Sequence, residues 1–275
     1  MLRFFNSLYF CHILSLILHK INQLILHKFF AKTQFLGKKV IFLPQCHSTN
    51  EVAMSLVNHG HAREGMVVIT EDQTAGKGQR GNSWHSEPGK NLTFSFIIKP
   101  HFVSLDRQFQ LHTIVSLGIL DAIRKFTNEQ LKVKWPNDIY LGEKKLGGIL
   151  IENTIRGSQI DYSVVGIGLN ANQVSFELPN ATSLIIHNKV EVNLDELAEE
   201  VLIQIEKRYS QVQEGINLMS EYEASLFGKE RERNFQDGKG KFRGIIKGVN
   251  ENGQLMVWDQ QCLRTYNFKE VSFLD

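Results

Sequence analysis

Gly76-Lys-Gly-Gln-Arg-Gly81 follows an apolar run, Met66-Val-Val-Ile-Thr70, which predicts a β-strand. These six residues match the glycine fingerprint of dinucleotide-binding domains letter for letter. In those domains a helix begins at the loop, and its N-terminus receives the pyrophosphate. Here Pro88 and Gly89 follow the loop and indicate a turn. No acidic residue stands in a second strand about 20 positions on, as the ribose contact needs. We therefore predict a different fold.

A glycine-rich loop of this kind can still bind an anion. Its glycines let backbone N–H groups approach a negative group closely, and Lys77 and Arg80 add two positive charges. Such a loop suits a carboxylate that condenses with a triphosphate, because that reaction concentrates negative charge on both partners. A flexible, solvated basic turn would have the same composition, so the loop alone leaves both interpretations open.

Strands and helices are predicted on both sides of the loop. Short apolar or alternating runs predict strands at residues 40–43, 66–70, 92–99, 133–135 and 139–141 and a hairpin formed by residues 148–153 and 161–168. Apolar residues at helical spacing predict helices over residues 51–58, 105–126 and 194–209. Ser48 or Thr49 is placed to cap the first of these helices.

The sequence pattern changes beyond about Gln236. Turn signals at Asp237-Gly, Lys247-Gly and Asn252-Gly separate short strand-like runs at residues 242–246, 255–258 and 265–268. Turn signals this dense predict a small β barrel of about 40 residues. We therefore divide the chain into an N-terminal extension (1–39), a larger domain (40–232) and a small C-terminal barrel (236–275).

The bulk composition is that of an ordinary globular protein. The 275 residues are 42% hydrophobic and 22% charged, and the net charge is +2. A wide basic surface for nucleic acid is therefore not expected. The three cysteines, Cys11, Cys46 and Cys262, lie far apart and share no metal-ligand spacing. A disulfide framework or a zinc site is therefore not expected, and a reducing, cytoplasmic location is the default.

Residues 1–39 differ from the rest of the chain because they contain no Asp or Glu. Their apolar stretch from Leu8 to Leu18 is shorter than the roughly 20 residues that cross a bilayer. Residues 14–25 carry apolar side chains at helical spacing, so an amphipathic helix is one interpretation. A membrane-surface anchor and a targeting peptide stay open beside a loosely packed extension or a translation start assigned too early. We favour the last two.

Five short segments give the sequence a specific resemblance. They are Ser48-Thr-Asn-Glu51, Gln73-Thr-Ala, Lys134-Trp-Pro-Asn-Asp138, Lys145-Leu-Gly-Gly-Ile149 and Gly166-Ile-Gly-Leu-Asn170. In this order and at these spacings they resemble the biotin–protein ligase family, of the monofunctional type without a helix-turn-helix domain. The resemblance covers about residues 40–275. It implies an α+β fold, in which a mixed sheet flanked by helices resembles class II aminoacyl-tRNA synthetases and an SH3-like barrel follows.

The resemblance also implies a two-step reaction. Biotin and Mg-ATP give biotinyl-5′-adenylate and pyrophosphate, and a lysine of a biotin carboxyl carrier domain then attacks the adenylate. The expected ligands are thus biotin, ATP and Mg²⁺, and the expected partner is a carrier domain of a biotin-dependent carboxylase. A homodimer is allowed and DNA binding is not expected. About 40 residues precede the first predicted strand, and they are too apolar and too few for the helix-turn-helix module of about 60 residues.

Residue by residue, the match assigns the following roles. Biotin binding falls to Ser48, Thr49, Asn50, Gln73, Lys77, Gly78, Gln79, Lys145, Gly148 and Gly166. ATP binding falls to Gly76, Arg80, Trp84, Asn137 and Asn170. Lys145, Lys77 and Asp138 are the candidate catalytic residues, and no residue is assigned as a protein metal ligand. Lys145 would stabilise charge at the junction of carboxylate and α-phosphate, and Asp138 would orient Lys145, bind Mg²⁺ or activate the incoming lysine.

Plain structural roles compete with several of these assignments. Ser48 could serve only as a helix cap, Trp84 as a core residue, and Asn137-Asp138 as a turn-forming pair. Gln79 departs from the family pattern, in which several members carry an arginine that retains the adenylate. Arg80 would then either replace that charge or leave a leakier intermediate.

Two other functions remain open. A lipoate or octanoate ligase shares the catalytic fold, although the polar Ser48-Thr-Asn start favours a polar ring over an acyl tail. A biotin-sensing regulatory protein is the alternative from another class.

Overall fold

The computed structural model describes residues 32–274 and contains two sheets. The larger sheet consists of β1 (Lys39–Cys46), β2 (Met66–Gln73), β3 (Leu92–Ile98), β4 (Leu131–Lys134), β5 (Asp138–Leu141), β6 (Lys144–Arg156) and β7 (Gln159–Leu169). Their order across the sheet is β1-β2-β3-β7-β6-β5-β4. Only β1 and β2 pair in parallel, and every other neighbouring pair is antiparallel, so the sheet is mixed.

The glycine-rich loop joins β2 to β3, and these two strands are antiparallel neighbours. A dinucleotide-binding unit would instead place a crossover helix between two parallel strands. The only helical turn in this connection is the three-residue 3₁₀ turn Gln79–Gly81. The predicted exclusion of the dinucleotide fold is therefore confirmed.

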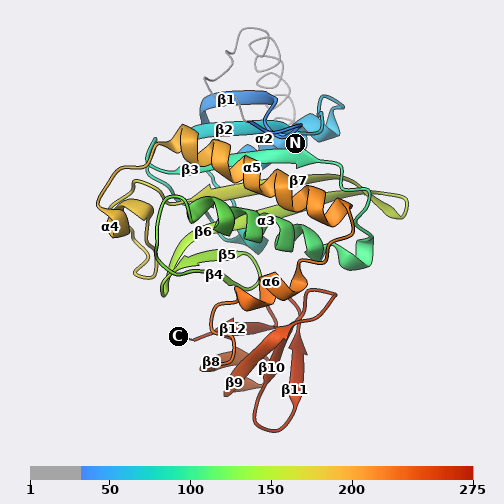
Figure 1. Cartoon of the computed structure of the whole chain (residues 1–275), viewed down its shortest axis with the longest axis vertical. Helices are drawn as coiled ribbons and strands as arrows, with labels where there is room; N and C mark the ends of the chain where they lie inside the picture. The colour runs from blue at the N-terminus through green and yellow to red at the C-terminus, as the bar shows by residue number, and fades with distance from the viewer. Residues whose placement is uncertain (1–31, 275) are drawn as a thin grey trace, which may run out of the picture.

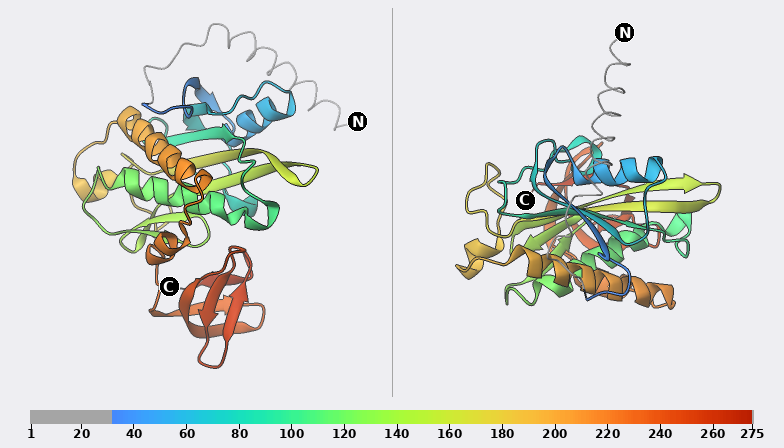
Figure 2. Two further views of the ribbon diagram at one scale, coloured as in Figure 1. Left: turned by 45° about the vertical axis from the view of Figure 1, so that its right-hand side comes forward. Right: turned by 90° about the horizontal axis from the view of Figure 1, so that it is seen from above.

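Helices cover both faces of the larger sheet (Figures 1 and 2). The helices are α2 (Thr49–Asn58), α3 (Phe109–Ile123), α4 (Leu184–Asn188), α5 (Leu194–Gln213) and α6 (Met219–Ala224), and a 3₁₀ turn at Leu105–Arg107 precedes α3. The α2 helix lies on one face and the packed pair α3 and α5 lies on the other (Figure 2). Each face has its own apolar core, and α3 is buried on nearly every side because α5 covers it.

A second sheet lies beyond the β4–β5 end of the larger one (Figure 1). It is antiparallel, with the order β11-β10-β9-β8-β12. Its strands are β8 (Glu232–Asp237), β9 (Gly240–Val249), β10 (Leu255–Trp258), β11 (Leu263–Tyr266) and β12 (Val271–Phe273). Its buried residues, such as Val249 and Leu255, join the same core cluster as α3. The predicted α+β fold with a mixed sheet and a C-terminal β domain is thus confirmed.

The start of the described chain packs against α5. Glu206, 7% exposed, accepts hydrogen bonds from the backbone N–H groups of Phe35 (2.8 Å) and Leu36 (2.9 Å), and Leu36 is fully buried. Residues 32–38 thus pack onto the larger domain, although the sequence placed them in the extension. The predictions for residues 1–31 lie outside the described residues. Among residues 32–274, no helix is long and apolar enough to cross a membrane.

Candidate functional site

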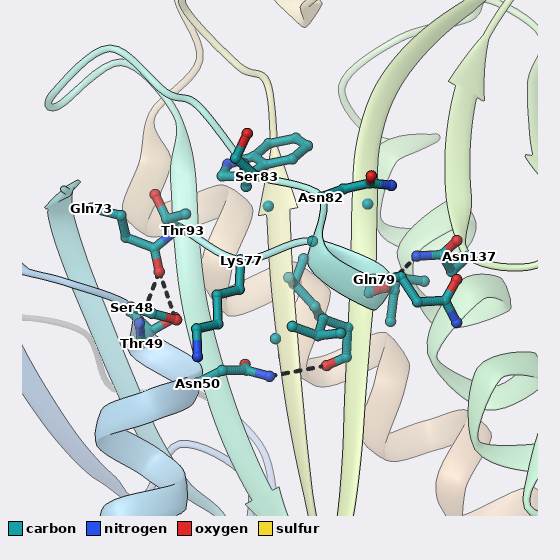
Figure 3. Close-up of a pocket in the computed structure, with 18 of the residues that line it drawn as sticks. Ser48, Thr49, Asn50, Gln73, Lys77, Gln79, Asn82, Ser83, Thr93 and Asn137 are labelled. Atoms are coloured by element: carbon teal, nitrogen blue, oxygen red, sulfur yellow. Dashed lines mark hydrogen bonds between the residues drawn. The ribbon is translucent and has the colours of Figure 1, made fainter. Parts of the chain in front are cut away.

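A polar pocket lies on the α2 face of the larger sheet, beneath the glycine-rich loop (Figure 3). Its walls come from the start of α2, the end of β2, the start of β3, the first half of β6 and the end of β7. The predicted residues that line it are Ser48, Thr49, Asn50, Gln73, Lys77, Gly78, Gln79, Trp84, Asn137, Asp138, Lys145, Gly148 and Gly166. The sequence motifs therefore converge on one cavity, although they are spread over more than a hundred residues.

Three predicted residues stand apart from this lining. Gly76 is buried beneath the loop, where a side chain would overlap the carbonyl of Trp84. Asn170 is 4% exposed and donates to the carbonyl of Thr182 (3.0 Å). The side chain of Arg80 lies outside the described part of the structure. Whether Arg80 replaces the charge absent at Gln79 therefore stays a prediction.

Gln73 organises one wall of the pocket through a single oxygen. Its Oε1 accepts from the backbone N–H of Thr49 (2.8 Å) and from the Thr49 hydroxyl (3.1 Å). Gln73 and Thr49 both line the pocket (Figure 3). Ser48 is at the N-cap position of α2, but its side chain makes no cap hydrogen bond to the described chain. This wall therefore presents both donors and acceptors to a polar ligand.

Asn50 forms the floor of the pocket and is held by three neighbours. Its Oδ1 accepts from Ser95 (2.6 Å), and its Nδ2 donates to Glu152 (2.8 Å) and to the Leu150 carbonyl (3.3 Å). The sequence analysis missed Ser95, a fully buried serine on β3 whose Oγ also lies 2.7 Å from the Thr49 hydroxyl. A hydroxyl in a run of apolar strand residues was the available signal, since a buried polar group needs a partner.

Lys145 and Asp138 meet at the opposite wall. The Lys145 ammonium is 2.6 Å from the Asp138 carboxylate. A β-bulge in the pairing of β5 with β6 sets Lys145 opposite Tyr140, two residues along from the pair Asp138 and Gly148. Without this bulge, alternation along the strands would set Leu146 opposite Tyr140. The neighbouring Lys144 is exposed.

Asn137 fastens the turn that carries Asp138. Its Nδ2 donates to the Ile149 carbonyl (2.7 Å), and the Ile149 N–H donates to the Asn137 carbonyl (2.9 Å). This closed pair of bonds fixes Asp138 relative to β6. Asp138 can therefore hold the Lys145 ammonium in a defined place, which is what charge stabilisation at a reaction centre needs.

Lys77 reaches down from the glycine-rich loop toward α2 (Figure 3). Its ammonium is 2.5 Å from Glu51, and the hydrogen bond to Glu51 raises the pKa of Lys77. The loop folds back on itself, because Lys77 and Ser83 form an antiparallel β-bridge and the Gly78 N–H donates to the Asn82 carbonyl (2.7 Å). Both lysines of the pocket are thus ion-paired with an acid and are available to an incoming anion only by exchange.

Trp84 closes the pocket above β7. A side chain on Gly168 would overlap the Trp84 ring, so the indole lies directly on the strand. The buried Nε1 of Trp84 has no hydrogen-bond partner among residues 32–274. A buried unpaired donor is costly, and here it borders a cavity in which a ligand can accept from it.

The sequence analysis also missed several lining residues, two of them in the β2–β3 connection and the others on strands that it had predicted. They are Asn82, Ser83, Thr93, Ile149, Leu150 and Ile167. Thr93 precedes Ser95 by two positions and so shares its face of β3. Among the described residues, no group of three His, Cys, Asp or Glu side chains is placed to hold a metal ion.

Known proteins resemble this chain in sequence and in fold. Residues 42–170 match the model of the Biotin/lipoate A/B protein ligase family. The chain is 29% identical over 240 residues to the bifunctional ligase/repressor BirA of Bacillus subtilis, covering 84% of this chain and 72% of that one. It is 29% identical over 219 residues to a biotin–[acetyl-CoA-carboxylase] ligase of Mycobacterium tuberculosis, covering 78% and 80%.

A solved structure of a biotin protein ligase also resembles this chain. The biotin protein ligase from Aquifex aeolicus in complex with biotin and ATP superimposes with a TM-score of 0.72 at 26% identity. The match covers 86% of this chain and 98% of that one.

Proposed function

The chain carries a domain of the biotin/lipoate A/B protein ligase family, and we propose that it is an ATP-dependent biotin–protein ligase. The observation that carries this proposal is the pocket. Its lining combines the hydrogen-bonded residues around Gln73 with two lysines, Lys77 from the glycine-rich loop and Lys145 from β6. A polar ring suits the wall, and a carboxylate and a phosphate suit Lys77 and Lys145. The relative from Mycobacterium tuberculosis and the structure from Aquifex aeolicus are both named for biotin, which supports biotin over lipoate.

The first step joins biotin to the nucleotide. A biotin carboxylate oxygen attacks the α-phosphorus of ATP, the new C–O–P linkage forms, and the bond to pyrophosphate breaks. Lys77 would hold the carboxylate, and Lys145 would stabilise negative charge as the linkage forms. Asp138 lines the pocket, and its carboxylate would suit Mg²⁺. Mg²⁺ commonly binds to one or two carboxylates together with substrate phosphates. That ion would screen the triphosphate charge.

The second step transfers biotin to a protein. The amine of an incoming lysine attacks the adenylate carbonyl, an amide bond forms, the bond to AMP breaks, and the amine loses its proton. Asp138 is the candidate for accepting that proton, because it lies beside the reaction centre on a fixed turn. We propose a carrier domain of a biotin-dependent carboxylase as the protein substrate, and the cytoplasm as the location.

The direct test is to incubate the protein with biotin, ATP and a purified carrier domain and to record intact masses. We expect the carrier to gain the mass of one biotin less one water, and only when both biotin and ATP are present. Pyrophosphate exchange with biotin or lipoate separates the two acids. Exchange with lipoate alone would overturn the proposal in favour of a lipoate ligase.

Repressor activity is tested separately, because some relatives are named as ligase/repressors. We expect no specific shift of promoter DNA in the presence of biotin. A specific, biotin-dependent shift would instead assign a regulatory function. Sedimentation of the same samples tests the homodimer, which stays a prediction.

Replacing Glu51 by glutamine should lower the KM for biotin. Glu51 is ion-paired with the ammonium of Lys77, so a carboxylate ligand must displace it. Partly exposed ion pairs are worth about 0.2–1 kcal/mol, so we expect a decrease of about two- to fivefold. The control is Glu71→Gln, which removes the same charge from an exposed position on β2. An unchanged or raised KM in Glu51→Gln would show that the pair does not compete with biotin.

Replacing Gln79 by arginine should slow the escape of the adenylate. Gln79 lines the pocket beside Asn137 (Figure 3), where a guanidinium could reach the phosphate. A hydrogen bond to a charged group is worth about 1.5–3 kcal/mol, so release should slow by at least about tenfold. Gln79→Met is the uncharged control. Equal escape rates from the arginine variant and the wild type would mean that Arg80 is already sufficient.

A further inference from the structure

Trp135 joins the β4–β5 turn to the C-terminal sheet. Its indole is 4% exposed, and its Nε1 donates to the carbonyl of Gly253, 118 residues away, at 2.9 Å. Its ring also lies against Phe268, with ring centroids 5.2 Å apart. The proposed reaction assigns no role to this tryptophan, although it stands in the same motif as Asn137 and Asp138.

The acceptor carbonyl is itself held firmly. Gly253 has a φ of +81°, and a Cβ there would lie 2.5 Å from the Phe109 ring. Only glycine therefore fits this close approach to α3. Asn250 closes the turn, because its Oδ1 accepts from the N–H groups of Asn252 (3.1 Å) and Gln254 (3.0 Å). The C-terminal sheet thus presents one oriented acceptor to Trp135.

The other end of this connection is the reaction centre. Two residues after Trp135, Asn137 is bonded reciprocally to Ile149. The next residue, Asp138, holds the Lys145 ammonium at 2.6 Å. Lys134, on the other side of Trp135, lies 4.7 Å from the ring of Phe273 in β12. The four-residue segment Trp135–Asp138 therefore links the carbonyl of Gly253 to the ammonium of Lys145.

We propose that Trp135 is a positioning residue, through which the C-terminal sheet holds Asp138 against Lys145. The kinetic part of this inference rests on the proposed function. The biotin wall comes from α2 and β2 and has its own hydrogen bonds through Gln73 and Ser95. Loss of the contact should therefore disturb the chemical step and leave biotin binding nearly unchanged.

The interface also holds a group suited to a matched control. Tyr222 is fully buried and packs on Phe109, with ring centroids 5.3 Å apart. Its hydroxyl has no hydrogen-bond partner in the described part of the chain. Tyr222→Phe therefore removes a buried polar atom from the same interface without breaking a contact to the motif.

The experiment compares full-length wild type with Trp135→Phe, Asn250→Ala and Tyr222→Phe. Trp135→Phe keeps a ring and loses the donor, and Asn250→Ala loosens the acceptor from a partly exposed position. Small displacements of reacting groups can cost up to about 100-fold, so we expect kcat for adenylate formation to fall about tenfold or more in Trp135→Phe. A smaller decrease in the same direction is expected in Asn250→Ala. The KM for biotin should stay within about twofold.

Hydrogen exchange at the Ile149 amide supplies a readout that does not depend on the reaction. This N–H donates to the Asn137 carbonyl, so we expect it to exchange faster in Trp135→Phe and Asn250→Ala and at the wild-type rate in Tyr222→Phe. Unchanged exchange at Ile149 in Trp135→Phe, or an equal loss of kcat in Tyr222→Phe, would overturn the proposal. Faster exchange in a protein that forms no adenylate would support the coupling and refute the ligase proposal.

Discussion

Lys145→Met is expected to lower the rate of biotinyl-adenylate formation by about 10²–10³-fold, the usual cost of removing one group that stabilises charge in the transition state. Methionine keeps the length and most of the volume of the side chain. The ammonium that faces the pocket is lost, and Asp138 is left without its partner at 2.6 Å. In the proposed reaction, the chemical step would therefore lose a positive charge where the carboxylate and the α-phosphate meet.

Lys144→Met is the matched control for this prediction. It removes the same charge from the adjacent residue of β6, which is exposed and lies outside the pocket lining. Single-turnover formation of the adenylate, with biotin and ATP in excess, measures the chemical step in both variants. A Lys145→Met protein that forms adenylate at the rate of Lys144→Met would remove Lys145 from the mechanism. Thermal unfolding of both variants separates a catalytic loss from a folding defect.

Most residues that line this pocket could be predicted from the sequence because they lie in short motifs. The glycine-rich loop carries Lys77, and the motif at the start of β6 carries Lys145 near Gly148. Each motif therefore includes the charged residue that it brings to the pocket. The order of the segments then supplied the resemblance. What the residues alone could establish was that the loop is not a dinucleotide site, because Pro88 and Gly89 exclude the helix that such a site needs.

The partners of these groups could not be predicted in the same way. The pairing of Lys77 with Glu51, and of Trp135 with Gly253, joins segments whose separation is set by the fold. Period-2 alternation tells which residues share a face of a strand but not which strand lies beside it. The strands β8 and β12 were missed for a related reason. Both strands are short and only partly buried, so their hydrophobic pattern is weak.

The N-terminal boundary illustrates the same limit of local patterns. Leu36 is fully buried, but three lysines lie within four residues of it, and the sequence analysis placed it in the extension. The carboxylate that receives this segment, Glu206, lies on α5, 170 residues further along the chain. In the sequence Glu206 reads as one more charged residue on an amphipathic helix. Its three-dimensional role as an acceptor for backbone N–H groups depends on the close approach of two distant segments.

Gly166→Ala should weaken biotin binding by at least about tenfold, equivalent to about 1.4 kcal/mol, and should lower the free energy of unfolding by about 2–4 kcal/mol. Gly166 pairs with Ser95 on one side and Leu150 on the other. A Cβ at this position would overlap Oδ1 of Asn50. Asn50 cannot move aside freely, because Ser95 and Glu152 both bond to its amide group. Displacing it leaves buried polar groups unpaired and shifts the start of α2.

Gly148→Ala provides the comparison that isolates this effect. A Cβ there would lie 3.6 Å from Asp138 and 3.7 Å from Lys145, which is ordinary van der Waals contact. Its free energy of unfolding should therefore stay within about 1 kcal/mol of the wild type. Both glycines were assigned to biotin binding from sequence, so unequal responses would show that Gly166 is required because Asn50 packs against it. Equal denaturant midpoints for the two variants would mean that the strand can yield and that the floor of the pocket is not rigid. In that case the polar wall around Thr49 and Gln73 would have to carry biotin recognition without the support of Asn50.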